Sequence, residues 1–424
     1  MSCILCFLDD NFQERLRRVS QSKADRFEHA LADFQANFLN ELKFLESADT
    51  CEVHKNFHVR TKTYADVFYQ KIKQQTDILQ FCNTLRHIYQ TWIEGQGAGA
   101  MSALRTLLNE KQIIKSTPRA NNLIYFRGRK SDSFLTKEEL FHIPFNKRHF
   151  ISNQRYSITG QPLLYLGLCP LDVVYEIRAK LSDLSSISFC SLVHTSADPL
   201  FVLDLNNPYL HDIANYEIMV SAGYNVNAPN ADVESDFYKF ILAQFCSFRR
   251  SRWTEHGVFA EEYVLPQLLT EILREDKYDG IMFSSTRVDT RVCYSKAKFH
   301  VNRFRENLAL FTNYDKNYDL DRNLFNKFLI SKPLMMDDLL EISLDDLNHI
   351  NQQIASMINI PGTVFPFHVD LKEITGISTK VLFEDVFIKE EGVEKPYFEH
   401  RLGKLHLQLI YQTLLELRNK TKLA

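Results

Sequence analysis

The fold of this chain is indicated most clearly by the stretch Asn153–Gly167, which reads NQRYSITGQPLLYLG. A polar run containing Arg155 leads through Gly160 and Pro162, two residue types that favour turns, into an apolar segment around Tyr165. A short apolar run bounded by turn residues is typical of a buried β-strand. The stretch therefore predicts a loop that leads into a core strand, with charged and aromatic side chains close to the junction.

Segments of the same kind recur on both sides of this stretch, separated by amphipathic runs. We expect strands at Leu123–Arg127, Leu163–Leu166, Ile187–Val193, Phe201–Leu205, Gly280–Phe283 and Asn307–Phe311. We expect helices at Pro170–Lys180, Glu234–Phe248 and Ala260–Glu275. This alternation predicts a mixed α/β domain over residues 119–315 and places the chain in the α+β class.

The regions that flank this domain are predicted to be mainly helical. Residues 1–118 repeat apolar side chains every three or four positions, with helices expected at Tyr64–Trp92, where the glycines of residues 95–99 end it, and at Ser102–Ile113. Residues 316–424 are expected to be mixed, with a helix at Asp337–Met357, strand-like segments at Thr363–Val369 and Lys380–Phe387, and an amphipathic helix at Glu399–Leu417. The apolar stripe of this last helix either closes the core, the commoner outcome, or forms a homodimer face.

Composition restricts the functional classes. A chain of 424 residues is expected to form two or three domains, and a net charge of -3 gives no basic field that would favour nucleic acid. No apolar run reaches the roughly 20 residues of a membrane span, and the N-terminus lacks a secretory signal pattern. The 8 cysteines are scattered through apolar segments, which indicates reduced thiols in the cytoplasm rather than a disulfide framework.

Glu176 is the most informative candidate for chemistry, because it lies between Val174 and Ile177 on an apolar helical face. Acidic residues are rarely buried unless they are paired or functional, and an ion pair with Arg178 or Arg155 is the structural alternative. Together with an arginine and an aromatic residue at the ends of core elements, this acid indicates a site for an anionic dinucleotide.

The other candidate residues have ordinary structural roles open to them as well. Arg155 and Arg127 supply guanidinium groups suited to phosphate, although surface arginines usually pair with solvent or with acids. Tyr165 offers a ring for stacking, or is a core tyrosine. Ser285, next to Ser284, either helps to place a ligand or caps a strand end.

These residues, taken in order, resemble the pattern of the RES domain family. The early strand ends in Arg127, Arg155 opens an Arg-Tyr-Ser-Ile-Thr-Gly run before Tyr165-Leu166, a helix carries Glu176, and Tyr278-Asp279-Gly280-Ile281 leads to Ser285, with Ser284 as the alternative serine. The resemblance implies a fold similar to that of the ADP-ribosyltransferases. It also implies a toxin or defence enzyme that cleaves NAD, with water, phosphate or a protein side chain as the acceptor.

The resemblance further assigns roles to these residues. It implies that Glu176, Arg155 and Ser285 are catalytic and that Arg127, Arg155, Tyr165 and Ser285 bind NAD, with no cofactor beyond NAD as the substrate. Toxins of the family are usually restrained by a helix-turn-helix antitoxin, and self-inhibition by the N-terminal domain is the alternative here. Larger relatives pair a Cys-x-x-Cys-Phe with a second Cys-x-x-Cys. Because only Cys3-x-x-Cys6-Phe7 is found in this sequence, we expect no metal.

Two hypotheses from different functional classes remain. Arg401 and His406 have the Arg-x(4–6)-His spacing of helical HEPN ribonucleases, which favours RNA cleavage or RNA binding. The second of these hypotheses is that the chain is a catalytically idle interaction module that has retained the fold.

Overall fold

The structure is a computed structural model that describes residues 2–74, 77–114, 117–119, 123–206, 213, 216–217, 219–228, 232–250, 259–288, 293–295, 305–343, 345–346, 349, 386–390 and 392–423. The chain forms two compact units. The first comprises residues 1–115, 153–158 and 203–276, and the second comprises residues 116–152, 159–202 and 277–424. These units divide the chain differently from the three consecutive domains that we expected, because residues 203–276 join the N-terminal helices.

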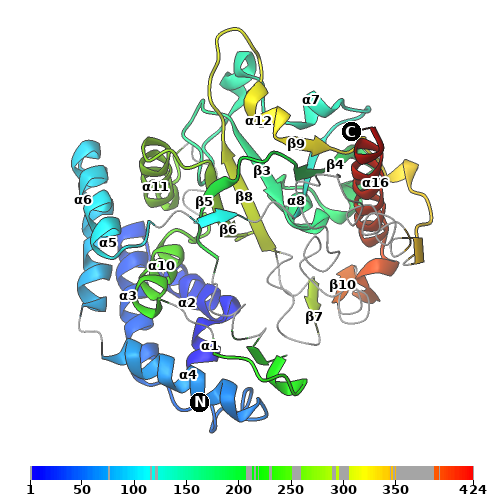
Figure 1. The fold of residues 1–424 in the computed structure, drawn as a ribbon. Coiled ribbons are helices and arrows are strands. Elements are labelled where there is room, and N and C mark those ends of the chain that lie inside the picture. The colour runs from blue at the N-terminus through cyan, green and yellow to red at the C-terminus, as the bar shows by residue number, and fades with distance from the viewer. Residues whose placement is uncertain are drawn as a thin grey trace. The chain divides into compact units, whose positions relative to one another are not determined.

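The second unit is built on an eight-stranded sheet with the order β1-β5-β6-β8-β3-β2-β4-β9 (Figure 1). The strands are β1 (Thr117–Arg119), β2 (Ile124–Lys130), β3 (Leu163–Gly167), β4 (Ile187–His194), β5 (Leu200–Asp204), β6 (Gly280–Ser284), β8 (Glu306–Phe311) and β9 (Phe328–Ile330). Pairing is antiparallel between β2 and β4, between β3 and β8, and between β6 and β8. All the predicted strands of the mixed domain are present at or close to their expected positions, so the α+β class is confirmed.

The sheet is covered on both faces, and alternation along its strands explains why. In β2, Ile124 and Phe126 pack into one apolar cluster, while Tyr125 between them packs into the other. Successive side chains of a strand point to opposite faces, so a strand that is covered on both sides has no solvent-exposed face. β4 is such a strand, since each of its residues is buried.

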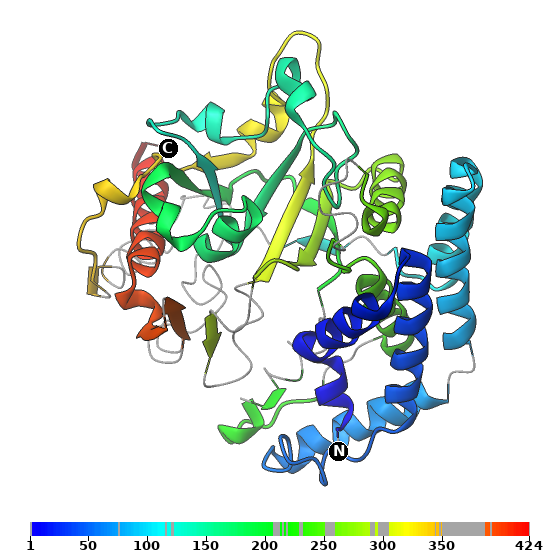
Figure 2. The same cartoon turned by 180° about the vertical axis from the view of Figure 1, so that it is seen from behind.

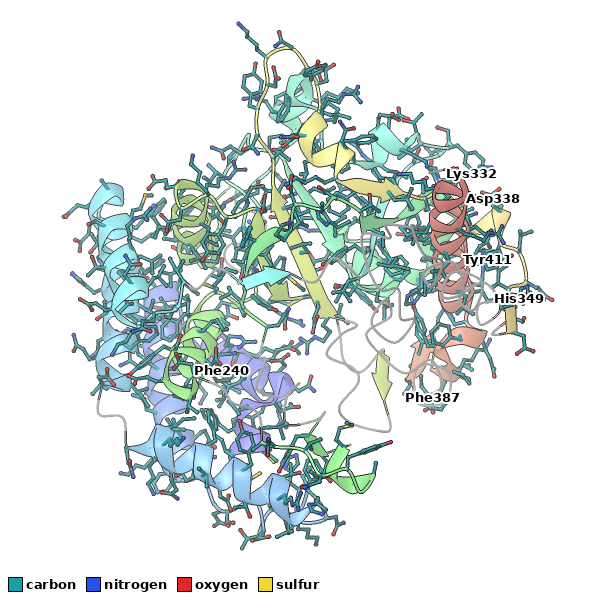
Figure 3. All side chains as sticks on the ribbon, viewed as in Figure 1. Phe240, Lys332, Asp338, His349, Phe387 and Tyr411 are labelled. Atoms are coloured by element: carbon teal, nitrogen blue, oxygen red, sulfur yellow. The ribbon has the colours of Figure 1, made fainter. Side chains whose placement is uncertain are left out.

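One face of the sheet is covered by α8 (Pro170–Glu176) and by the terminal helix α16 (Arg401–Leu423), as Figure 2 shows from behind. Figure 3 shows Tyr411 on α16 with Lys332 and Asp338 beside the helix. Gln408 of α16 donates a hydrogen bond to the carbonyl oxygen of Asp338 at 3.1 Å. The apolar stripe of α16 is buried in this core, including Leu405, Leu409, Ile410 and Leu414. The stripe therefore closes the core and is not the homodimer face that we kept as the alternative.

The second unit also contains a small sheet of three strands, in the order β11-β10-β7, formed by β7 (Cys293–Ser295), β10 (Val386–Glu390) and β11 (Val393–Pro396). Its other helical elements among the described residues are α7 (Lys137–Leu140), η1 (Phe145–Phe150), η2 (Leu181–Ser186), α12 (Arg322–Asn326), η5 (Met336–Asp338) and η6 (Tyr397–Glu399). The strand-like segment expected at Thr363–Val369 lies outside the described residues, as do most of the expected helix at Asp337–Met357 and most of the expected strand at Lys380–Phe387.

The first unit is helical. It contains α1 (Ile4–Leu8), α2 (Asp10–Lys23), α3 (Phe27–Lys43), α4 (Val59–Lys73), α5 (Ile78–Ile93), α6 (Gly97–Glu110), α10 (Val233–Phe245), η3 (Glu261–Tyr263) and α11 (Val264–Glu275). Aromatic side chains join its distant segments. Phe34 of α3 packs edge-on against Phe245 and Phe248, with ring centroids 5.6 and 5.3 Å apart. These contacts explain why residues 203–276 belong to this unit.

Three predicted helix boundaries were wrong. The helix expected at Tyr64–Trp92 is divided into α4 and α5. The helix expected at Ser102–Ile113 is α6, which begins earlier, at Gly97. Gly95, with a left-handed φ of 84°, ends α5, and the glycines after it can start a new helix. The helix expected at Pro170–Lys180 ends at Glu176, since Arg178 adopts a positive φ of 55°. Among the described residues, no helix combines the length and apolarity that a membrane crossing requires.

Candidate active site and candidate metal centre

Glu176 is the centre of a group of polar side chains in the second unit. Its Oε1 atom accepts a hydrogen bond from the Ser285 hydroxyl at 2.6 Å and another from the Asn307 side-chain amide at 3.1 Å. Both donors are nearly enclosed, with Ser285 1% and Asn307 3% exposed. Two fixed donors on one oxygen hold a carboxylate in a defined orientation.

The sheet brings these residues together from separate parts of the sequence. Glu176 is the last residue of α8, Ser285 directly follows β6, and Asn307 is in β8. In the antiparallel pair, Phe283 of β6 lies opposite Asn307, so the end of β6 is held next to that side chain. The backbone N–H of Ser285 also donates to the carbonyl oxygen of Arg305. The serine is thus fixed by its backbone before its hydroxyl reaches Glu176.

Arg287 is a neighbour of this site that was not predicted from the sequence. Its Nε atom lies 3.4 Å from Oε2 of Glu176, and its backbone N–H donates to the Ser285 hydroxyl oxygen at 3.2 Å. The side chains of Arg287 and Glu176 are 31% and 28% exposed, so this side of the carboxylate reaches solvent. The structural alternative for Glu176, an ion pair with Arg178 or Arg155, is replaced by Arg287. The only sequence signal for Arg287 is its position two residues after Ser285.

Asp172 is a second acid of α8, one helical turn before Glu176, and it is completely buried. Neither of its carboxyl oxygens accepts a hydrogen bond from a described residue. Burial, together with the negative charge of Glu176, raises the pKa of Asp172 well above its ordinary value, although Ser285, Arg305 and Asn307 oppose the rise. Burial and the neighbouring charge therefore favour the neutral form of Asp172 more than they would for an exposed aspartate.

Arg127 and Tyr165 lie together in the second unit, on neighbouring strands. The guanidinium group of Arg127 donates to the carbonyl oxygen of Tyr165 at 2.6 Å and to that of Leu140. Burial lowers the pKa of Arg127 to about 10. This guanidinium binds the backbone of β3, the strand that carries Tyr165. The NAD contact that was predicted for Arg127 stays a prediction.

Arg155 belongs to the first unit. Its guanidinium group donates to the carbonyl oxygens of Cys246 and Phe248, at 2.5 and 2.7 Å, just beyond α10. Its Cζ atom lies 5.0 Å from the centroid of the Tyr263 ring, a cation–π distance. The structure therefore assigns the arginine a role in closing the end of α10, and the predicted phosphate clamp stays a prediction.

His406, on which the ribonuclease alternative depends, is in the core of the second unit. It is 5% exposed, and its ring packs edge-on against Phe126 with the centroids 4.6 Å apart. Burial lowers the pKa of His406 to about 3. An imidazole enclosed in this way does not reach an RNA phosphate, which argues against HEPN-like cleavage at this position.

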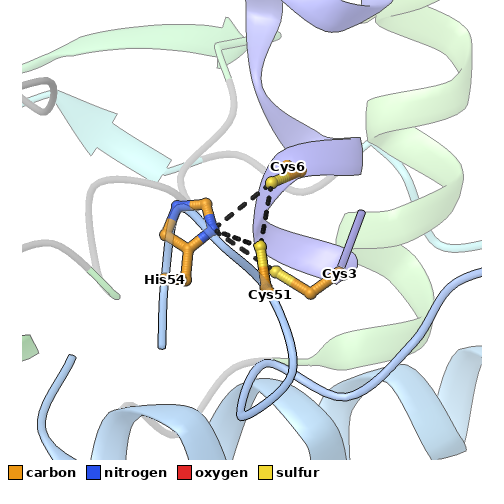
Figure 4. A group of neighbouring side chains, drawn as sticks. All are labelled: Cys3, Cys6, Cys51 and His54. Carbon is orange, nitrogen blue, oxygen red and sulfur yellow. Dashed lines mark hydrogen bonds between the residues drawn. The ribbon is translucent and has the colours of Figure 1, made fainter. Parts of the chain in front are cut away.

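A group of potential metal ligands lies in the first unit, and Figure 4 shows it: Cys3, Cys6, Cys51 and His54. Their three Sγ atoms and one imidazole nitrogen all lie within 4.8 Å of one another. The hydrogen bond from Cys3 lowers the pKa of the Cys6 thiol to about 3 against the opposing effect of burial, and His54 adds to the lowering. These four side chains form a donor set that can hold a metal ion, and the expectation of no metal stays a prediction.

The second half of this group was not predicted from the sequence. Cys51-x-x-His54 has the spacing of a metal-binding pair, but its second member is histidine where a cysteine was sought. A Cys-x-x-Cys or Cys-x-x-His pattern would have predicted it.

Comparison with known proteins gives a partial match. No family model matches the chain, and no solved structure matches it. A protein of Bacillus subtilis (strain 168) named "Putative toxin YopC" is 30% identical over 196 residues, which is 45% of this chain and 40% of the relative. The chain thus spans less than half of the relative's length. It is similar, over that part, to a protein named as a toxin.

Proposed function

We propose that this chain is a toxin-like enzyme of the RES type, with an ADP-ribosyltransferase-like fold, that cleaves the nicotinamide–ribose bond of NAD. The observation that carries the proposal is the carboxylate of Glu176. One of its oxygens is fixed by Ser285 and Asn307, while the side chain still reaches solvent. A buried structural acid has no need of an open face, whereas a catalytic acid requires one.

The chemistry suits a fixed anion. The bond between ribose C1′ and the nicotinamide nitrogen breaks, and its electron pair leaves with the nicotinamide, whose positive charge is thereby cancelled. The ribose develops an oxocarbenium-like cation, which a preorganised carboxylate stabilises. The acceptor then forms the new bond to C1′ and loses its proton, with water, phosphate and a protein side chain as the candidates.

The surrounding residues take supporting roles in this proposal. Ser285 and Asn307 orient Glu176, and Arg287 holds its second oxygen while being exposed enough to meet an anionic substrate. Arg127 positions β3 and so the ring of Tyr165, which is proposed to stack on the nicotinamide.

Replacing Glu176 by Gln tests the proposal, since the amide keeps the shape and removes the charge. Nicotinamide release from NAD is followed by NMR or chromatography with the purified full chain, with and without phosphate. We expect turnover to fall about 100-fold or more, a typical range for the loss of such a group. Glu138→Gln, in an exposed acid of α7, is the matched control and should keep full turnover.

The serine assignment has its own matched pair. Ser285→Ala removes a hydrogen bond to a charged group, and a loss of about 1.5–3 kcal/mol corresponds to a roughly 10- to 100-fold slower reaction. Ser284→Ala, one residue earlier, should leave the rate unchanged. Parental turnover in Glu176→Gln would refute the role of the carboxylate. An equal loss in both serine variants would refute the orienting role of Ser285.

Restraint of such an enzyme is a second part of the proposal. NAD depletion halts growth, so either a helix-turn-helix antitoxin or the chain's own N-terminal helices are proposed to hold it inactive. Addition of a neutralising partner should lower nicotinamide release in proportion to complex formation. Full activity of the isolated complete chain would exclude self-inhibition.

A further inference from the structure

We infer that Cys3, Cys6, Cys51 and His54 bind one zinc ion in a closed, tetrahedral structural site. The inference concerns the first unit and is independent of NAD cleavage. Three thiols and one imidazole nitrogen form a donor set that zinc prefers in proteins. His54 is the one nitrogen donor, so the site has three sulfur ligands and one nitrogen ligand.

The distances fit a zinc tetrahedron. Nδ1 of His54 lies 3.4, 3.3 and 3.5 Å from the Sγ atoms of Cys3, Cys6 and Cys51, and the Sγ atoms of Cys6 and Cys51 are 3.5 Å apart. Zinc–sulfur bonds of about 2.3 Å and zinc–nitrogen bonds of about 2.0–2.1 Å place ligand atoms roughly 3.5–3.8 Å from one another across a tetrahedral ion. These four separations are therefore close to those that a zinc ion requires, and all the ligand atoms lie within 4.8 Å of one another.

Neither a disulfide nor apolar packing accounts for this group of side chains. A disulfide requires sulfur atoms about 2.05 Å apart, and the Cys6–Cys51 separation of 3.5 Å is far longer. Apolar packing suffices for a buried thiol such as Cys82, which has no such neighbours among the described residues. It gives no reason for one nitrogen of His54 to be directed at all three sulfur atoms (Figure 4).

Local structure holds both halves of the site in place. Cys3 is the N-cap of α1 and Cys6 lies one turn later, so a single short helix presents both thiols. In the second half, the N–H of His54 donates to the carbonyl oxygen of Cys51, which forms a tight turn. The halves are joined where the Glu46 N–H donates to the carbonyl oxygen of Ser2 at 3.1 Å. A preformed site of this kind loses little conformational freedom when the ion binds.

The site is structural because it is closed. Cys3 and Cys51 are almost completely buried and His54 is 8% exposed, and the four protein ligands leave no position for water or substrate. Its role follows from α1, which is too short to be stable alone. The ion anchors that helix, and with it Phe7, whose ring packs 4.9 Å from Phe38 and 6.4 Å from Phe240.

The metal content of the purified full chain tests the inference. Elemental analysis after growth in zinc-replete medium should give about one zinc per chain, as for sites with four protein ligands in general. Cys51→Ser should reduce this at least about tenfold, because three ligands hold the ion far less tightly. Cys82→Ser, a buried thiol of α5 outside the group, is the control and should keep the zinc.

A second measurement identifies His54 and does not depend on a weakened variant. Cobalt replaces zinc in such sites, and its visible absorption depends on how many sulfur atoms bind it. His54→Cys should still bind one ion and shift the cobalt bands towards those of a four-sulfur site, whereas His29→Ala, at an exposed histidine of the same unit, should change nothing.

Alkylation with mass mapping completes the test. Cys3, Cys6 and Cys51 should be protected in the zinc form and become reactive when a chelator removes the ion. Three results would overturn the inference: wild-type protein free of zinc after zinc-replete growth, a Cys6–Cys51 disulfide in its place, or an unchanged cobalt spectrum in His54→Cys.

Discussion

Replacing Asp172 by Asn should make the stability of the chain less dependent on pH. The side chain is completely buried, accepts no hydrogen bond from a described residue, and lies one turn from Glu176. Burial first, and the charge of Glu176 second, raise the pKa of Asp172 well above its ordinary value. Asparagine has nearly the same shape and cannot ionise, so it imitates the neutral acid at every pH.

The sign follows from proton linkage. The pKa of Asp172 is higher in the folded state than in the unfolded state, where it is about 3.9. The folded state therefore holds a proton that the unfolded state has lost, and the stabilisation present below about pH 4 is lost as the pH rises towards the folded pKa. One proton changes the free energy of unfolding by about 1.4 kcal/mol per pH unit. An asparagine side chain at this position has no such dependence.

Urea unfolding at four pH values from about 5 to about 8, followed by circular dichroism, measures this difference. The free energy of unfolding of Asp172→Asn minus that of the wild type should rise by about 1.4 kcal/mol per pH unit from about pH 5 upward, until the folded pKa is reached. Contributions from titrating groups that do not interact with Asp172 cancel in the difference. Asp132→Asn, at an exposed acid, should show a difference that does not vary with pH.

A flat difference across this pH range for Asp172→Asn would refute the reasoning. It would mean that Asp172 is ionised in the folded protein and that the group around Glu176 carries two negative charges. A steep difference would establish the neutral acid without reference to any substrate.

Three further predictions concern packing. Gly403→Ala should lower the free energy of unfolding by about 1–3 kcal/mol or more in thermal denaturation, because a Cβ atom there meets the backbone of η6, whereas Gly97→Ala has room and should be neutral or slightly stabilising. His406→Ala should destabilise the core by a similar amount and leave RNA untouched in a nuclease assay, and RNA cleavage that depends on His406 would contradict its burial. Deleting residues 1–115 should give aggregated protein in size-exclusion chromatography, since it uncovers aromatic side chains of α10 such as Phe240, and a monomeric, fully folded product would contradict this.

The sequence predicted six of the eight strands of the large sheet, because each of these six carries its own local signal. β3 and β8 are short apolar runs bounded by turn residues, and such local patterns need no knowledge of partners. Helix ends that depend on one backbone angle were not predicted. The end of α8 is an example, because it depends on the positive φ of Arg178. The group around Glu176 was predicted only in part. Ser285 was named, but Asn307 resembles any polar residue of a strand until β8 is placed beside β6.

Two features that were not predicted from the sequence depend on contacts between distant residues: the group of metal ligands and the burial of Asp172. His54 is separated from Cys3 by the length of α2 and α3, and neither residue signals the other unless histidine is accepted in place of cysteine. Asp172 resembles an ordinary acid in a helix, because burial depends on what α8 packs against. The extent of the first unit was missed for the same reason, since contacts such as that of Phe34 with Phe248 join segments that are far apart in the chain.

The discontinuity of the first unit has a consequence for how the protein is made. Its N-terminal helices leave the ribosome first, but α10 and α11, which complete their core, are finished only when synthesis reaches residue 276. At about 5–20 residues per second, Phe27, Phe34 and Phe38 wait several seconds or longer for their aromatic partners. Nascent chains stalled near the end of β3 should therefore recruit chaperones that bind exposed apolar surface, and chains stalled well beyond residue 276 should release them.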